Sequence, residues 1–162
     1  MAIEMSTAGI QLGWAMETVA GVMPMGDDVY TRIRGITTIG ALDAAPATIE
    51  VTDLNDTRFA RFIDDLISID GAIELDHNMT DEFLEDWMDG IMPAYEQGIV
   101  DGLQMWFTVF IPRLQYGNFY FRGNPSVLGL PAIAIREAFT GTAAITPTLI
   151  HSWDAKHTIA EP

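Results

Sequence analysis

The stretch that most constrains this chain is 78–92, NMTDEFLEDWMDGIM, in which apolar and acidic residues recur at helical spacing. The residues between the apolar ones are almost all acids, so this helix has one bulky face and one anionic face. Asn78 or Thr80 can cap its start, and Pro93 is expected to end it. The expected packing face consists of Phe83, Leu84, Trp87, Met88 and Ile91. Because the flanking segments have strand patterns, we expect one helix, at about 80–92, packed on a β-sheet.

Several segments alternate apolar and polar residues, as strands with one buried face do. The clearest are 48–54, TIEVTDL, and 72–76, AIELD. In the second, the apolar residues should face the helix and leave Glu74 and Asp76 on the opposite face of the sheet. Longer apolar runs predict further strands at 103–111, 118–122 and 132–139. The predicted class is α+β and mainly antiparallel, a β-sandwich or barrel with one flanking helix.

The stretch 55–70, NDTRFARFIDDLISID, is ambiguous. Its apolar residues fit a short helix, and its charged residues form a local mixture of both signs. A connection of this length with apolar residues of its own is often functional, and the alternative is a surface loop folded back on the core. Its candidate functional residues are Arg58, Phe59, Arg61, Phe62, Asp64 and Asp65.

The charge is strongly acidic, with 8 Lys and Arg against 23 Asp and Glu and a formal net charge of −15. Such a surface repels phosphates, which disfavours a protein that grips nucleic acid. The absence of cysteine excludes disulfides and thiol catalysis. No apolar run is long enough for a membrane-spanning helix, and the start of the chain lacks a basic signal segment, so we expect a cytoplasmic location without membrane insertion. The 49% hydrophobic content favours self-assembly.

We expect no enzyme, no cofactor and no metal site, because the sequence holds neither a phosphate-binding glycine loop nor a nucleophile motif. The histidines His77, His151 and His157 are not spaced as metal ligands. Glu74 and Asp76 would form a hydrolytic carboxylate pair only beneath a cleft. A different class of function is a small β-barrel binding module that holds an apolar ligand among aromatic side chains: Trp106, Phe107, Phe110, Phe119 and Phe121.

The segments TIEVTDLND, DEFLEDW, LQMWFTVFIP and GNPSVLGLPAIAI, followed by ITPT, succeed one another in an informative order. In that order they resemble the major tail proteins, or tail tube proteins, of long-tailed bacteriophages of the siphophage type. The resemblance covers roughly residues 1–155. It departs from the family pattern at 25–39 and after His151.

This resemblance implies one tail-tube domain over 1–162 with extended terminal arms at about 1–23 and 142–162. It also implies hexameric rings that stack into the tube through which the genome is ejected, with the 55–70 loop reaching the adjacent ring. The lumen-facing candidates would be Glu50, Glu74 and Asp76. An anionic lumen would let DNA pass without adhering to the wall.

The implied partners are other copies of the chain, tail terminator and tail-tip or initiator proteins, the tape measure protein in the lumen, and DNA in transit without specific binding. The implied location is the virion, after synthesis in the cytoplasm of the bacterial host. The inner tube of a contractile injection system is the alternative within the same fold.

Overall fold

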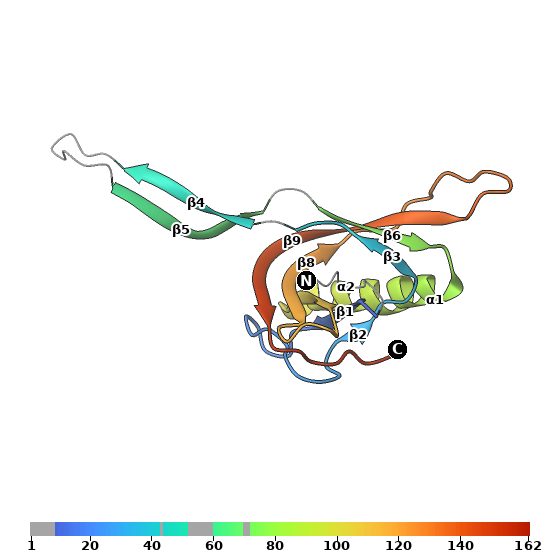
Figure 1. Ribbon diagram of the computed structural model, residues 1–162, viewed down its shortest axis with the longest axis horizontal. Coiled ribbons are helices and arrows are strands. Elements are labelled where there is room, and N and C mark those ends of the chain that lie inside the picture. The colour runs from blue at the N-terminus through green and yellow to red at the C-terminus, as the bar shows by residue number, and fades with distance from the viewer. Residues whose placement is uncertain (1–8, 43, 52–59, 70–71) are drawn as a thin grey trace, which may run out of the picture.

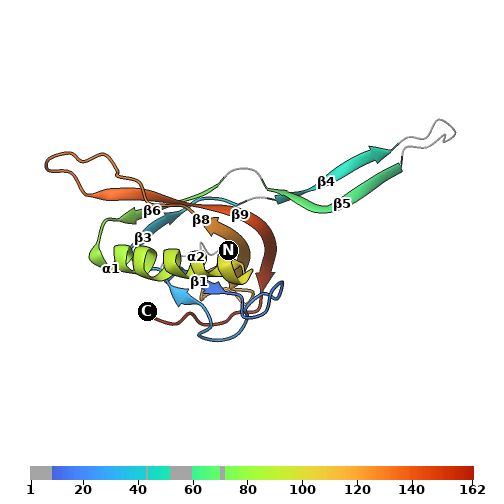
Figure 2. The ribbon, with the colours of Figure 1, turned by 180° about the vertical axis from the view of Figure 1, so that it is seen from behind.

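The computed structural model describes residues 9–42, 44–51, 60–69 and 72–162, with only the backbone over 44–51 and 60–69. A seven-stranded antiparallel sheet bends around one helical segment, and a two-stranded hairpin extends away from this body (Figure 1; Figure 2 from behind). The hairpin pairs β4 (Ala44–Val51) with β5 (Ala60–Ile69). The predicted α+β class, mainly antiparallel with one flanking helix, is confirmed.

The order of strands in the large sheet is β2-β1-β7-β8-β9-β6-β3. Their bounds are β1 Gln11–Met16, β2 Thr31–Arg32, β3 Ile36–Ile39, β6 Ile73–Asn78, β7 Met105–Phe110, β8 Asn118–Pro125 and β9 Thr140–Asp154.

The two edge strands of this sheet, β2 and β3, are joined by residues 33–35 alone. The chain therefore passes directly from one edge of the sheet to the other. The Ile33 amide donates to the Leu12 carbonyl at 2.8 Å, and the Asn78 amide donates to the Gly35 carbonyl at 3.0 Å. These bonds hold the crossing segment to β1 on one side and to β6 on the other, so the sheet is bent back on itself.

The helical segment is longer than predicted. It comprises α1 (Asp81–Leu84), a π-helical stretch η1 (Glu85–Ile91) and α2 (Met92–Asp101). The Met92 amide bonds to the Trp87 carbonyl five residues back, so the ladder restarts there and Pro93 falls in the first turn of α2. A missing N–H costs little in a first turn, which is why Pro93 does not end the helix. Gly102 ends it, at φ 72°.

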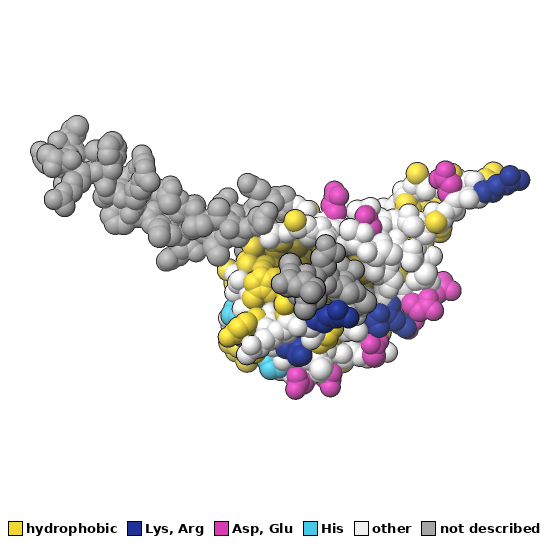
Figure 3. Space-filling model, viewed as in Figure 1, with side chains coloured by type: hydrophobic (Ala, Val, Ile, Leu, Met, Phe, Trp, Pro, Cys, Tyr) yellow, Lys and Arg dark blue, Asp and Glu magenta, His cyan; other side chains and the backbone are white. Residues whose placement is uncertain are grey.

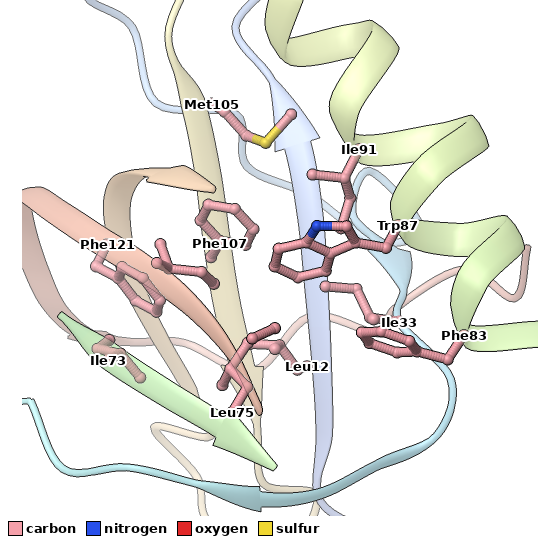
Figure 4. Packing of buried hydrophobic residues seen from close by; sticks show 12 residues of the cluster. Leu12, Ile33, Ile73, Leu75, Phe83, Trp87, Ile91, Met105, Phe107 and Phe121 are labelled. Atoms are coloured by element: carbon pink, nitrogen blue, oxygen red, sulfur yellow. The ribbon is translucent and has the colours of Figure 1, made fainter. Parts of the chain in front are cut away.

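The inside of the bent sheet is filled by side chains of this helical segment (Figure 4). Phe83, Trp87 and Ile91 are each 0% exposed, and Leu84 is half-buried against the same cluster. Met88 was expected on this face but is 46% exposed, because a π-helical turn takes more residues than an α-turn and rotates it outward. The rest of the cluster comes from β1, the crossing segment, β6, β7, β8 and β9: Leu12, Ile33, Ile73, Leu75, Met105, Phe107, Phe121, Ala143 and Ile145.

A second buried cluster lies on the other face of β1, β7 and β8 and consists of Ala15, Tyr30, Trp106, Tyr120 and Ile159. The C-terminal segment 155–162 covers it. The Ala160 amide donates to the Tyr30 carbonyl at 2.8 Å, and the Arg32 amide donates to the Ala160 carbonyl at 2.9 Å. These central strands are therefore buried on both faces.

The two predicted arms are largely part of the body. Of the N-terminal range 1–23, residues 1–8 lie outside the described ranges, and Gln11–Met16 is β1, paired along its length with β7. Of the C-terminal range 142–162, residues up to Asp154 belong to β9, and the remainder packs against the body of the same chain.

Two further segments differ from expectation. The predicted strand 132–139 lies in a loop, 126–139, which projects from the body between β8 and β9 (Figure 1). Its alternating Ile133 and Ile135 are 69% and 92% exposed, so no sheet face buries them. In the 55–70 stretch, residues 60–69 form β5 rather than a short helix, because pairing with β4 satisfies their backbone.

Replacing Trp87 with Ala should lower the free energy of unfolding by about 3–5 kcal/mol, since it empties the centre of the core. Met88→Ala, one residue along, is the matched control and should change it by less than about 0.5 kcal/mol. Urea denaturation followed by far-UV circular dichroism measures both. Equal losses for the two variants would contradict the described orientation of the helix.

Candidate assembly surfaces

The outer face of β6 and β9 carries two of the predicted lumen residues. Glu74 and Asp76 are exposed and alternate with the buried Ile73 and Leu75. In the β6–β9 register, Glu74 lies opposite Ala144 and Asp76 opposite Thr142, whose hydroxyl donates to the Asp76 carboxylate at 3.0 Å.

Threonines continue this outer face along β9 as Thr140, Thr146 and Thr148, all exposed. Arg122 of β8 donates to the Thr148 hydroxyl at 3.0 Å. The face is thus polar, with carboxylates and hydroxyls in a row. The third predicted lumen residue, Glu50, lies on β4 opposite Arg61, and its side chain is outside the described residues.

The β4–β5 hairpin extends well beyond the body (Figure 1). Its register runs from Ala44 opposite Ile69 to Val51 opposite Ala60, with an irregularity between Pro46 and Thr48. Within the described part of the chain β4 and β5 pair only with each other, so each presents an unpaired edge. Of the predicted stacking residues, Arg61, Phe62, Asp64 and Asp65 lie on β5, while Arg58 and Phe59 fall outside the described residues.

An ion pair with a buried carboxylate and a partly exposed guanidinium ties the crossing segment to the helix. Asp86 accepts hydrogen bonds from the Arg34 amide at 2.9 Å, from Nε at 3.0 Å and from a terminal guanidinium nitrogen at 2.8 Å. The Asp86 side chain is 4% exposed and that of Arg34 is 32% exposed. By its spacing in the sequence, Asp86 belongs with the acids of the anionic helix face, yet the structure buries it against Arg34.

Polar side chains also hold in place the segments that pack over the second cluster. The buried Glu17 carboxylate accepts from the Trp106 indole at 2.8 Å and from the Gly21 amide at 2.9 Å. Asn118 accepts from the His157 amide at 2.8 Å, which fixes the C-terminal segment. Burial, with the nearby Asp154 charge, raises the pKa of Tyr120 to about 12, so this side chain stays neutral.

The three histidines lie in three different environments. His77 is buried and stacked on Phe83, with ring centroids 3.7 Å apart. His151 lies 2.9 Å from Asp154, and His157 lies 3.3 Å from Asp27. Within the described residues no three His, Asp or Glu side chains are placed to hold a metal ion together. Likewise, no helix in these ranges is long and apolar enough to cross a membrane.

The aromatic residues of the binding-module hypothesis do not line one cavity. Phe107 and Phe121 fill the inner core, whereas Trp106 belongs to the cluster on the other sheet face. Phe119 is half-buried and lines an apolar groove of about 460 Å³ at the open end of the bent sheet. The groove residues are Ile10, Ile39, Gly40, Leu42, Ile73, Val109, Ile111, Phe119, Phe121 and Trp153.

The 126–139 loop is the second apolar surface. Apolar side chains gather along this loop and on the body beside the hairpin base (Figure 3). The exposed residues of the loop are Val127, Leu130, Ile133, Ile135 and Phe139.

No family model matches this chain, and no curated protein sequence does. Two solved structures share its fold over nearly its whole length. A chain in the sixfold-symmetrised baseplate of the anti-feeding prophage aligns with a TM-score of 0.52 at 6% identity, covering 93% of this chain and 96% of that one. A chain in the tail of an empty GTA particle, computed with C6 symmetry, aligns with a TM-score of 0.51 at 14% identity, covering 92% and 98%.

Removing either partner of the Arg34–Asp86 ion pair should lower the stability of the fold, but by unequal amounts. Arg34→Met removes both guanidinium hydrogen bonds from the buried Asp86 carboxylate and leaves it only the backbone amide of residue 34, whereas Asp86→Asn leaves a guanidinium that water can reach. The urea midpoint should therefore fall further for Arg34→Met than for Asp86→Asn. Arg136→Met, in the exposed loop, is the control and should leave the midpoint unchanged. The reverse order would contradict this account.

Burial lowers the pKa of His77 below its ordinary value of 6.5, although the hydrogen bond to the Asn78 carbonyl and the Asp76 charge partly oppose the shift. The unfolded chain therefore takes up this proton at a higher pH than the folded chain does. Stability from His77 should be complete above pH 6.5 and decline as the pH falls through the lowered pKa. His77→Phe keeps an aromatic ring on Phe83 and should reduce the loss of urea midpoint between pH 7.5 and pH 5. Equal losses in both proteins would rule out His77 as the source.

Proposed function

We propose that this chain is a structural subunit of a phage tail or tail-like particle, and that it self-assembles into stacked hexameric rings forming a tail tube. The observation that carries the proposal is the shared fold: a bent sheet with a flanking helix, matched over more than nine-tenths of the chain by chains from two sixfold assemblies. The resemblance to tail tube proteins along the sequence supports it independently. The proposed role is structural and not enzymatic.

The lumen in this proposal is lined by the outer face of β6 and β9. Glu74 and Asp76 are exposed there among threonine hydroxyls, and Glu50 would extend the acidic surface along β4. Carboxylates on the wall repel DNA phosphates and threonines offer no apolar or aromatic grip, so DNA would pass without specific binding. The acids of the helix would then lie outside and contribute solubility.

Ring stacking in this proposal depends on the β4–β5 hairpin. It extends from the body with unpaired strand edges, which are favourable templates for another chain. Arg61, Phe62, Asp64 and Asp65 on β5 would contact the adjacent ring. Other partners would be tail terminator, tail-tip or initiator proteins and the tape measure protein, in a virion assembled in the bacterial host.

A second candidate keeps the same tube but places it inside a contractile injection system. It is favoured by the likeness to a chain of the anti-feeding prophage baseplate. A sheath gene beside the gene for this chain would support this candidate, because a non-contractile tail has no sheath.

Negative-stain electron microscopy of the purified protein tests the proposal. Raising the salt concentration should promote rings or tubes with a central bore, since salt screens the −15 charge of each subunit. The double variant Glu74→Gln, Asp76→Asn should form the same tubes at lower salt. A wild-type protein that remains monomeric at every concentration and salt, and binds an apolar dye saturably, would overturn the proposal in favour of a binding module.

Shortening the hairpin separates stacking from ring formation. A variant that replaces residues 46–67 with a tight two-residue turn should form rings but no tubes. Its matched control carries Met88→Ala on the outer face of the helix and should assemble as the wild type does. Tubes of normal length from the shortened variant would remove the hairpin from the stacking contact.

A further inference from the structure

We infer that the 126–139 loop of one copy inserts into the apolar groove at the open end of the bent sheet in the next copy, so that neighbouring subunits join head to tail. This inference rests on the proposed self-assembly and assigns the contact between neighbours. Two surfaces, their placement and the charge of the chain support it.

The loop is a projecting arm with a fixed base. The Ser126 amide donates to the Ala144 carbonyl at 2.9 Å, and the Met79 amide donates to the Phe139 carbonyl at 3.0 Å. The Ser126 carbonyl also accepts from the Trp87 indole at 3.1 Å, which ties the base to the core. Since its base is fixed, little conformational freedom at the base would be lost on docking.

The outer part of the loop presents apolar side chains to solvent. Leu130 is 85% exposed and Ile135 is 92% exposed, and these residues make no contribution to the core of their own subunit. A contiguous exposed apolar segment of this kind marks a partner surface.

The groove offers the complementary shape. Its floor is formed by Ile73 and Phe121 of the core, and its rim by residues such as Ile111 and Trp153, the latter 48% exposed. A hollow of about 460 Å³ with apolar walls fits branched aliphatic side chains.

The two surfaces lie at opposite ends of the same strands. The loop joins β9 at Thr140 and hydrogen-bonds beside the end of β6, whereas the groove includes Ile73 at the start of β6 and Trp153 near the end of β9. The loop projects away from the body rather than folding back over the sheet (Figure 1), so its tip does not occupy the groove of its own chain. Repeated head-to-tail contacts between copies close into a ring when the rotation permits.

Charge identifies a second copy as the occupant. The chain carries −15, so two copies repel wherever their acidic surfaces meet. The loop carries one Arg and one Glu, Arg136 and Glu137, and is neutral overall, and the groove residues carry no charge. Contacts between copies at these two surfaces thus avoid the repulsion, whereas a strongly basic partner would gain more at the acidic faces elsewhere.

Cysteine cross-linking tests this contact directly, because the chain has no cysteine of its own. The double variant Ile135→Cys, Ile111→Cys, treated with a short bismaleimide, should give a ladder of covalent oligomers on a denaturing gel. The matched control, Ile135→Cys with Ile99→Cys, places the second thiol on the exposed outer side of α2, where Ile99 is 65% exposed, and should give no ladder.

A second variant, Ile135→Asp, puts a charge where an apolar contact is inferred. It should raise the concentration needed for rings by at least about tenfold, the effect of losing one buried anchor. Val100→Asp, at a residue 79% exposed on α2, should leave that concentration unchanged. Thermal unfolding of the monomers should be alike, because neither side chain packs in the core.

The outcomes separate this inference from the proposed function. Tubes from the wild type, without a ladder from Ile135→Cys, Ile111→Cys and without an effect of Ile135→Asp, would overturn the loop contact and leave the tube intact. A ladder formed by a protein that makes closed rings but never tubes would support the loop contact and count against the tube. Absence of both tubes and ladder would overturn both.

Discussion

The structure depends on the insertion of one helix face into a sheet that is bent back on itself. Seven strands whose edges are joined by residues 33–35 enclose a space that their own side chains do not fill. Phe83, Trp87 and Ile91 fill it, and each is fully buried. The same helix holds the crossing segment through Asp86 and Arg34, and Trp87 holds the base of the 126–139 loop. The sheet closure, the helix and the projecting loop are therefore one mechanical unit.

The spacing of apolar residues in the sequence correctly predicted the features that depend on neighbouring residues alone. The helix was visible because its apolar residues share one face, and the exposure of Glu74 and Asp76 followed from the two-residue period of strand β6. The sequence did not predict that the helix continues past Pro93, because the rule that proline ends helices assumes an uninterrupted ladder of i to i−4 hydrogen bonds. The π-helical stretch before Pro93 breaks that assumption. Met88 was misplaced for the same reason.

Long-range partners decided the remaining differences. Asp86 resembles its acidic neighbours in sequence, and its burial depends on Arg34, 52 residues away. Ile133 and Ile135 alternate as they would in a half-buried strand, yet they lie in a projecting loop and are exposed. Alternating apolar residues indicate a face that is favourably buried, but the pattern does not show whether the burying surface belongs to the same chain. The candidate assembly contact was therefore present in the sequence as a strand signal.

Charged and apolar surfaces lie on different parts of the molecule. Carboxylates occupy the outer face of β6 and the solvent side of the helix, while the uncharged apolar surfaces lie at the two ends of β6 and β9. In a chain of net charge −15, close contact between two copies meets least repulsion where both surfaces are uncharged. In the proposed tube, this favours the end-to-end loop contact between neighbours in a ring, while the separate β4–β5 hairpin would make the contacts between rings. In that proposal, acidity would favour one geometry of association, because it penalises face-to-face arrangements of two identical acidic surfaces.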